Sequence, residues 1–237
     1  MISLITLSPE ELAKKIDNTL LKPSASYSEL ESFCRNSIKF NFVCCVVPPW
    51  FVRRAKDILR KTGLKVATVI GFPLGYQSIN TKLSEAKEAI SNGADEIDVV
   101  ANISAFKSGK YDYVCEEISK LAELAHKNNV VIKVIIETSL LSQDEIIDFS
   151  KLLLNCNVDY VKTNTGFMER GVRPSDIILI KSVVGNKLKI KAAGGIRTWQ
   201  DTLLYIMLGA DRIGTSSGIN IIKKYMEYLR RKQGINI

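Results

Sequence analysis

The sequence predicts a (β/α)8 TIM barrel of the α/β class with an extra N-terminal helix. Eight short apolar segments alternate with helical patterns along the chain, as expected for repeated βα units. These segments are nearly continuous apolar runs, typical of parallel strands buried on both faces. No G-x-G-x-x-G motif follows the first segment, which disfavours an open dinucleotide-binding sheet. A chain of 237 residues, 46% of them hydrophobic, suits one domain, which we place at residues 1–237.

The first half of the chain begins with the extra helix. Ser8 is a good N-cap, and Pro9 suits the first helical position, so a helix should run to about Lys15. The next apolar segments end at proline, glycine or asparagine, as strands do before a turn. We expect strands at residues 16–21, 41–47, 65–71 and 96–102, separated by helices at about 28–36, 50–61 and 80–92.

The second half repeats the alternation. We expect strands at residues 130–137 and 160–163 and, each with its following loop, at 189–195 and 212–218. Helices are expected at about 111–128, 142–155, 174–184 and 199–208, and a last helix follows residue 218. Eight units in about 220 residues favour a closed barrel over a doubly wound sheet.

Polar side chains occupy one face of several predicted strands. Side chains alternate along a strand, so five charged residues should point into the barrel while their apolar neighbours face the helices. They are Asp98, Lys133, Glu137, Lys162 and Lys191. The carboxyl ends of barrel strands carry catalytic groups in this fold class, so we interpret the cluster as a candidate active site. For any one residue, a structural ion pair is the alternative interpretation.

Lys162 is the candidate nucleophile. A buried lysine near other lysines should have a lowered pKa, and a neutral amine attacks carbonyl carbons. A nearby carboxylate could move protons through water. The alternative is a lysine at the strand end whose ammonium group reaches solvent.

Two glycine-rich loops suggest a phosphate site. Gly194 and Gly195 follow the seventh predicted strand, and the sequence GTSSG, which includes Gly214, Ser216 and Ser217, follows the eighth. Backbone N–H groups before a helix bind anions, and many barrels hold phosphate after their last two strands. Glycine in ordinary turns is the alternative.

Composition narrows the function further. The five cysteines form no C-x-x-C motif, which fits free thiols in a reducing compartment, and the single histidine, His126, excludes a multi-histidine metal site within one chain. The formal net charge of +8 is spread along the chain without a nucleic-acid motif. We find no apolar run long enough to span a membrane and no signal peptide, so we expect a cytoplasmic protein.

The motifs IDNTLLKP, TVIGFPLG, NGADEIDVV, IKVIIET, VKTNTGF, IKAAGGIRT and ADRIGTSSG, in this order over nearly the whole chain, resemble the deoxyribose-phosphate aldolase family. The resemblance implies a class I aldolase that reversibly cleaves 2-deoxy-D-ribose 5-phosphate to D-glyceraldehyde 3-phosphate and acetaldehyde, without a metal or other cofactor. It also implies a homodimer or homotetramer.

The resemblance assigns roles to individual residues. Lys162 would form the Schiff base, Lys191 would lower its pKa, and Asp98 would move protons with a water molecule. The supporting relay would be Lys133, Glu137 and Asp17. Substrate and phosphate would bind at Thr165, Gly166, Gly194, Gly195, Gly214, Ser216 and Ser217.

Three positions depart from the family pattern. Asn18 stands in place of a histidine, Val47 in place of an asparagine, and Asn164 in place of a serine. We expect Val47 and Asn164 near the barrel mouth, where they could alter substrate preference. Alternative functions are another Schiff-base phosphosugar aldolase or transaldolase, a phosphosugar isomerase, a non-catalytic phosphosugar-binding barrel, and, least favoured, a nucleic-acid binder.

Overall fold

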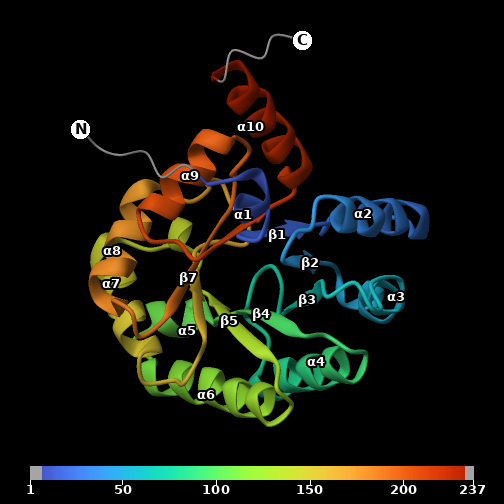
Figure 1. The fold of residues 1–237 in the computed structure, drawn as a ribbon. Coiled ribbons are helices and arrows are strands. Elements are labelled where there is room, and N and C mark those ends of the chain that lie inside the picture. The colour runs from blue at the N-terminus through green and yellow to red at the C-terminus, as the bar shows by residue number, and fades with distance from the viewer. Residues whose placement is uncertain (1–6, 233–237) are drawn as a thin grey trace.

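Eight parallel strands close into a barrel in the computed structural model, which describes residues 7–232 (Figure 1). The strands are β1 (Ile16–Thr19), β2 (Cys44–Val46), β3 (Lys65–Ile70), β4 (Glu96–Val100), β5 (Val131–Ile135), β6 (Tyr160–Lys162), β7 (Lys189–Ala193) and β8 (Arg212–Thr215). Each strand pairs with the next, and β8 pairs with β1 to close the ring. The predicted (β/α)8 barrel is confirmed, while residues 1–6 and 233–237 of the predicted domain lie outside the described residues.

The helices surround the strands (Figure 1). They are α1 (Pro9–Ala13), α2 (Tyr27–Lys39), α3 (Val52–Ile58), α4 (Ile79–Ser91), α5 (Ile103–Lys107), α6 (Tyr111–Lys127), α7 (Gln143–Leu153), α8 (Pro174–Val184), α9 (Trp199–Met207) and α10 (Gly218–Lys232). The predicted extra helix is α1, where the side chain of Ser8 accepts a hydrogen bond from Glu11 N–H and that of Glu11 accepts one from Ser8 N–H. Within residues 7–232, no helix is both long and apolar enough to cross a bilayer.

Short elements account for most differences from the prediction. Three short elements are not predicted from the sequence: α5, whose cap is the Asn102 side chain, and the two 3-10 turns η1 (Pro49–Phe51) and η2 (Thr138–Leu140). Strand β5 ends at Ile135, before the predicted end at Glu137. Glu137 itself has a left-handed backbone with φ of 49°, which ends the extended conformation and leads into η2.

The apolar core lies mainly between the strands and the helices. Outward-facing strand residues such as Ile97, Ile132 and Val161 are fully buried there. A second, small apolar cluster lies on the inward face of β2 and β3 and consists of Cys44, Val46, Ala67 and Val69. Charged side chains fill much of the remaining interior. All five cysteines are free thiols.

Candidate active site

Inward-facing side chains fill the barrel in layers that alternate between even and odd strands. Strand register defines three successive layers from the N-terminal end of the barrel. They are Cys44, Glu96, Tyr160 and Arg212; then Asp17, Ala67, Lys133 and Lys191; then Val46, Asp98, Lys162 and Gly214. Such layers are usually apolar, so the charged residues in all three make this interior unusual.

Lys162 and Asp98 meet in the third layer, close to the C-terminal end of the barrel. Lys162 Nζ donates to Asp98 Oδ2 at 2.8 Å, and Lys191 Nζ donates to the same oxygen at 2.7 Å. Lys133 Nζ donates to Asp98 Oδ1 at 3.1 Å. Asp98 is fully buried and Lys162 is 4% exposed, so one carboxylate holds three lysines in a nearly dry interior.

The pKa of Lys162 shifts in the opposite direction from that of the other two lysines. Burial lowers the pKa of Lys162 to about 8, with Asp98 opposing the decrease and the Lys191 ammonium adding to it. Burial acts in the same direction on Lys191, but Asp17 and Asp98 outweigh it and raise its pKa. Carboxylates likewise raise the pKa of Lys133 well above its usual range, against the effect of burial. Lys162 is therefore the lysine that loses its proton most easily.

Carboxylates in the two lower layers balance the remaining cations. Asp17 Oδ2 lies 2.6 Å from Lys191 Nζ, and Asp17 Oδ1 accepts a hydrogen bond of 2.6 Å from Arg212. Glu96 pairs with Lys133 and, at 3.5 Å, with Arg212. Burial would raise the pKa of Asp98, but Lys133, Lys162 and Lys191 hold it well below its usual range. The cluster thus contains the three carboxylates of Asp17, Glu96 and Asp98, and its charges balance when Lys162 is neutral.

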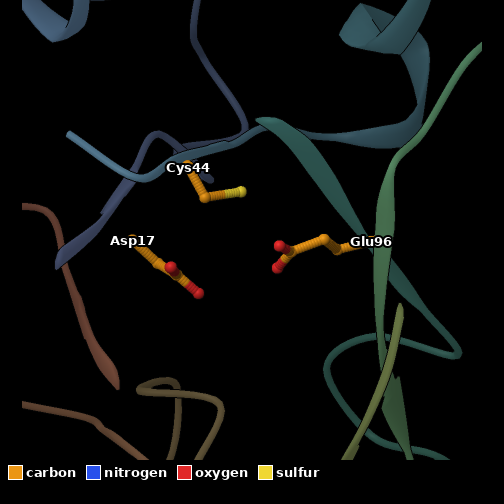
Figure 2. Close-up of side chains that lie close together, drawn as sticks. All are labelled: Asp17, Cys44 and Glu96. Carbon is orange, nitrogen blue, oxygen red and sulfur yellow. The ribbon is translucent and has the colours of Figure 1, made fainter. Parts of the chain in front are cut away.

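Asp17, Cys44 and Glu96 point toward one another and resemble a metal-binding trio (Figure 2). Their potential ligand atoms all lie within 4.8 Å of one another. Both carboxylates are already paired with buried cations, however. Burial also raises the pKa of the Cys44 thiol well above its usual range, whereas a metal binds the thiolate. These donors therefore suit an ion-pair cluster better than a metal ion.

Glu137 lies apart from the lysine cluster. Its carboxylate accepts hydrogen bonds from Asn164, from both the N–H and the hydroxyl of Thr165, and from Ser139. Within residues 7–232 it forms no ion pair with a lysine, so its placement differs from the expected position in a relay. We expected Thr165 to contact substrate, but its N–H and hydroxyl groups donate to Glu137 instead.

The two predicted phosphate loops lie side by side at the mouth. Gly194 and Gly195 have φ of 102° and 77°, and both lie beyond β7. The hydroxyl of Thr215 donates to the Ile196 carbonyl at 2.6 Å, which links this loop to the one that carries Ser216 and Ser217. Ser216 is exposed, and α10 begins two residues later. The backbone of the two loops could therefore face one anion.

Gly214 lies at a different place from these loops. It is a buried residue of β8 in the third layer, where a Cβ atom would lie 2.9 Å from Lys191 Cε. A glycine at this position therefore leaves room for the Lys191 side chain. Gly166, with φ of 84°, does lie beside the β7 loop, since a Cβ atom there would lie 3.7 Å from Gly194 Cα.

Two of the three unusual positions, Asn18 and Val47, face away from the barrel interior. Asn18 faces outward and donates to Ser37 on α2 at 3.0 Å. Val47 is fully buried in the core between strands and helices, and Asn164 is fully buried beside Glu137. Val47 and Asn164 follow the C-terminal ends of β2 and β6, as expected for residues near the mouth, but both side chains are enclosed by protein.

A cavity of about 450 Å³ opens at the barrel mouth. Its lining comes from loops at the C-terminal ends of several strands and includes Leu21, Pro48, Phe72 and Phe167. Val69, the register partner of Asp98, also lines it, so the cavity reaches the neighbourhood of the third layer. It offers a route from solvent toward the charged interior.

Sequence reasoning missed Glu96, Arg212 and Tyr160 as interior groups. The side chains of Lys133 and Arg212 lie over the Tyr160 ring, 5.7 and 5.9 Å from its centre. Glu96 precedes Asp98 by two residues, and Tyr160 precedes Lys162 by two, so the same alternation that selected the upper residues could have found the lower ones.

Comparison with known proteins agrees with this architecture. Residues 12–224 match the DeoC/LacD family of aldolases. Deoxyribose-phosphate aldolase from Caldicellulosiruptor saccharolyticus is 47% identical over 220 residues, which cover 92% of this chain and 100% of that protein. The enzyme of the same name from Thermococcus gammatolerans is 44% identical over 90% of this chain and 96% of its own.

Solved structures give the same result. A putative deoxyribose-phosphate aldolase from Coccidioides immitis is 35% identical, with a TM-score of 0.90 over 93% of this chain and 87% of its own. The tetrameric deoxyribose phosphate aldolase from Aeropyrum pernix is 33% identical, with a TM-score of 0.87 over 93% of both chains. The resemblance seen in the sequence motifs is confirmed, and the chain belongs to the DeoC/LacD family of aldolases.

Proposed function

We propose that this aldolase reversibly cleaves 2-deoxy-D-ribose 5-phosphate to D-glyceraldehyde 3-phosphate and acetaldehyde, through a Schiff base on Lys162. One observation carries the proposal: a buried lysine with a pKa lowered to about 8 contacts Asp98 inside the barrel of a DeoC/LacD aldolase. The relatives named deoxyribose-phosphate aldolase support the choice of substrate.

The reaction begins at the Lys162 amine. At pH 7 a pKa of about 8 leaves about a tenth of the amine neutral, against less than about a thousandth for an unperturbed lysine. The neutral nitrogen attacks the C1 aldehyde of the open-chain sugar, and the resulting carbinolamine loses water to give an iminium ion. Asp98 is ionised and within contact distance, so its negative charge stabilises the new cation.

Cleavage uses the iminium ion as an electron sink. The proton of the C3 hydroxyl leaves, the C2–C3 bond breaks, and its electron pair forms an enamine on Lys162. Glyceraldehyde 3-phosphate departs, the enamine is protonated at C2, and hydrolysis releases acetaldehyde and the free lysine. We assign the proton transfers to Asp98 and Lys191 acting through water, because Lys162 and Lys191 both donate a hydrogen bond to the same carboxylate oxygen of Asp98.

The phosphate end of the substrate is assigned to the β7 and β8 loops. Gly194, Gly195, Ser216 and Ser217 provide backbone N–H groups and serine hydroxyls near the start of α10. Lys133 and Asp17 are assigned a supporting role, because they fix Asp98 and Lys191 by ion pairs.

No metal or organic cofactor takes part in the proposed chemistry, because the lysine itself supplies the electron sink. Full activity after treatment with EDTA is expected. We further propose a homo-oligomer that acts in the cytoplasm; the tetramer of the Aeropyrum pernix relative supports the first point, and the free thiols are compatible with the second. Light scattering of the purified protein would determine the number of subunits.

The decisive experiment combines an activity assay with trapping. Wild type should release acetaldehyde from deoxyribose 5-phosphate, and Lys162→Ala should not. Borohydride reduction in the presence of acetaldehyde should add an ethyl group to the peptide that contains Lys162. An active preparation in which Lys162 remains unmodified would refute the assignment. Trapping combined with turnover of a different phosphosugar would identify another Schiff-base aldolase, and ligand binding without turnover would identify a non-catalytic barrel.

A further inference from the structure

Glu137 occupies a strained and enclosed position beside the active site. It is 1% exposed and has φ of 49°, a left-handed conformation that costs free energy for any residue other than glycine. A residue remains in such a conformation only when its surroundings fix it there, and strain of this kind concentrates at functional sites. The contacts of its side chain show what is being fixed.

Four donors saturate the Glu137 carboxylate. Oε1 accepts from Asn164 Nδ2 at 2.8 Å and from Ser139 Oγ at 2.5 Å. Oε2 accepts from Thr165 N at 2.9 Å and from Thr165 Oγ1 at 2.6 Å. Three of the four donors belong to the loop that follows β6, so one buried carboxylate from the β5 loop holds the β6 loop.

The segment held by Glu137 forms part of the wall of the proposed phosphate site. The hydroxyl of Thr165 also accepts the Phe167 N–H at 3.2 Å, which closes a turn around Gly166. Gly166 lies beside Gly194, and a Cβ atom on Gly194 would lie only 3.0 Å from Asn164 Cβ. The β6 and β7 loops therefore pack closely, and the position of one sets the position of the other.

A second set of contacts anchors the far side of the same loop. Arg170 donates to Asp176 at 2.8 Å and to the Thr138 carbonyl. Gly171 lies against the β7 loop, where a Cβ atom would be 2.4 Å from the Gly194 carbonyl oxygen. Both ends of the β6 loop are thus fixed, one by Glu137 and the other by Arg170.

We infer that Glu137 is a positioning residue that fixes the β6 loop against the β7 loop, which carries Gly194, and so determines binding of the substrate phosphate. The inference rests on the proposed function. It replaces the earlier expectation that Glu137 joins the proton relay, because its hydrogen bonds lead to Asn164 and Thr165 and not to the lysines.

A glutamine at this position cannot make the same contacts. Its single oxygen can accept from two donors, while its amide nitrogen accepts from none. The N–H of Thr165 and the amide of Asn164 are fixed donors, so Glu137→Gln leaves one of them buried without an acceptor. Hydrogen bonds to charged groups are stronger than neutral ones, and we expect the KM for deoxyribose 5-phosphate to rise about ten- to hundredfold.

The test compares the phosphorylated sugar with unphosphorylated 2-deoxyribose. Glu137→Gln should lower kcat/KM for the phosphorylated sugar by about tenfold or more and leave that for 2-deoxyribose within about twofold. Thr165→Val, which removes one donor and keeps side-chain volume, should shift the same ratio in the same direction. Thr165→Val decides the question if Glu137→Gln does not fold. The matched control is Ser139→Ala, which removes a donor to Glu137 without altering the β6 loop and should leave the ratio unchanged.

Several outcomes would overturn the inference. An equal loss with both sugars would mean a general structural role. A fall in kcat with a displaced pH profile would return Glu137 to the proton relay. Wild-type release of acetaldehyde from deoxyribose 5-phosphate, measured first, separates either outcome from a failure of the proposed function.

Discussion

Removing the Lys191 ammonium tests how the charged interior sets the reactivity of Lys162. The substitution Lys191→Met keeps an unbranched side chain of similar volume and deletes one positive charge. Lys162 and Lys191 contact the same oxygen of Asp98 at 2.8 and 2.7 Å. At an effective dielectric constant of about 20, two unit charges roughly 5 Å apart repel by about 3 kcal/mol, which corresponds to about two pKa units.

The expected result is a rise in the pKa of Lys162. Burial, the largest cause of its lowered pKa, persists in the variant, so we expect an increase from about 8 by about one to two units. Asp98 also loses a cation and attracts the Lys162 proton more strongly, which acts in the same direction. At pH 7 the neutral fraction of Lys162 then falls about ten- to a hundredfold.

The assay should report formation of the Schiff base alone, because Lys191 is also assigned to proton transfer. Acetaldehyde is mixed with enzyme at a series of pH values, reduced with borohydride after short intervals, and the ethylated fraction is measured by intact mass. The initial rate should increase with pH in both proteins, with the midpoint for Lys191→Met displaced upward.

An unchanged midpoint in Lys191→Met would refute the electrostatic reasoning for Lys191 and leave burial and the Lys133 ammonium as the causes of the lowered pKa. The matched control is Lys82→Met. Lys82 is also fully buried, but it pairs with Glu117 at 2.8 Å outside the barrel interior. Its loss should reduce thermal stability and leave the midpoint in place.

Four further predictions concern the same interior. Asp98→Asn should lower kcat by about a hundred- to ten-thousandfold, measured as acetaldehyde release, if Asp98 moves protons as proposed. Gly214→Ala should reduce kcat by displacing Lys191, since its Cβ atom would lie 2.9 Å from Lys191 Cε; unchanged turnover would contradict this. Arg212→Met should lower the free energy of unfolding by about 3–5 kcal/mol in denaturant titration, because Asp17 loses a partner. The pKa values of Asp17 and Asp98 are lowered in the folded protein, so these carboxylates stabilise the fold fully above their unfolded pKa, and this stabilisation is lost as pH falls toward the folded pKa. The melting temperature should therefore fall below about pH 4.

The fold could be predicted because buried parallel strands leave a strong pattern. Residues 42–47 are all apolar and are followed by two prolines, and capping residues such as Ser8 and Ser142 mark helix starts. The prediction failed where local geometry has no periodic signal. Helix α5 spans only five residues, and β5 ends early because Glu137 turns into a left-handed conformation.

The site could be predicted only in part, for a related reason. Alternation along single strands selected Asp98, Lys162 and Lys191, which the structure brings together. It does not reveal contacts between neighbouring strands that are far apart in sequence, such as that between Arg212 on β8 and Asp17 on β1, which are 195 positions apart. Nor does it reveal loop conformations, so Glu137 was placed among the lysines although its partners lie in the β6 loop.

The cost of the charged interior argues that it serves the chemistry more than the stability. Buried ion pairs contribute little net stability, and apolar side chains of similar volume would fill the barrel at least as well. This arrangement does have one consequence that an apolar filling could not give. The cations Lys133, Lys191 and Arg212 balance the carboxylates of the cluster, so a proton on Lys162 adds an unbalanced charge to a buried interior. The two lower layers thereby favour the neutral amine in the layer above, while Asp98 remains ionised to stabilise the iminium cation that the amine forms.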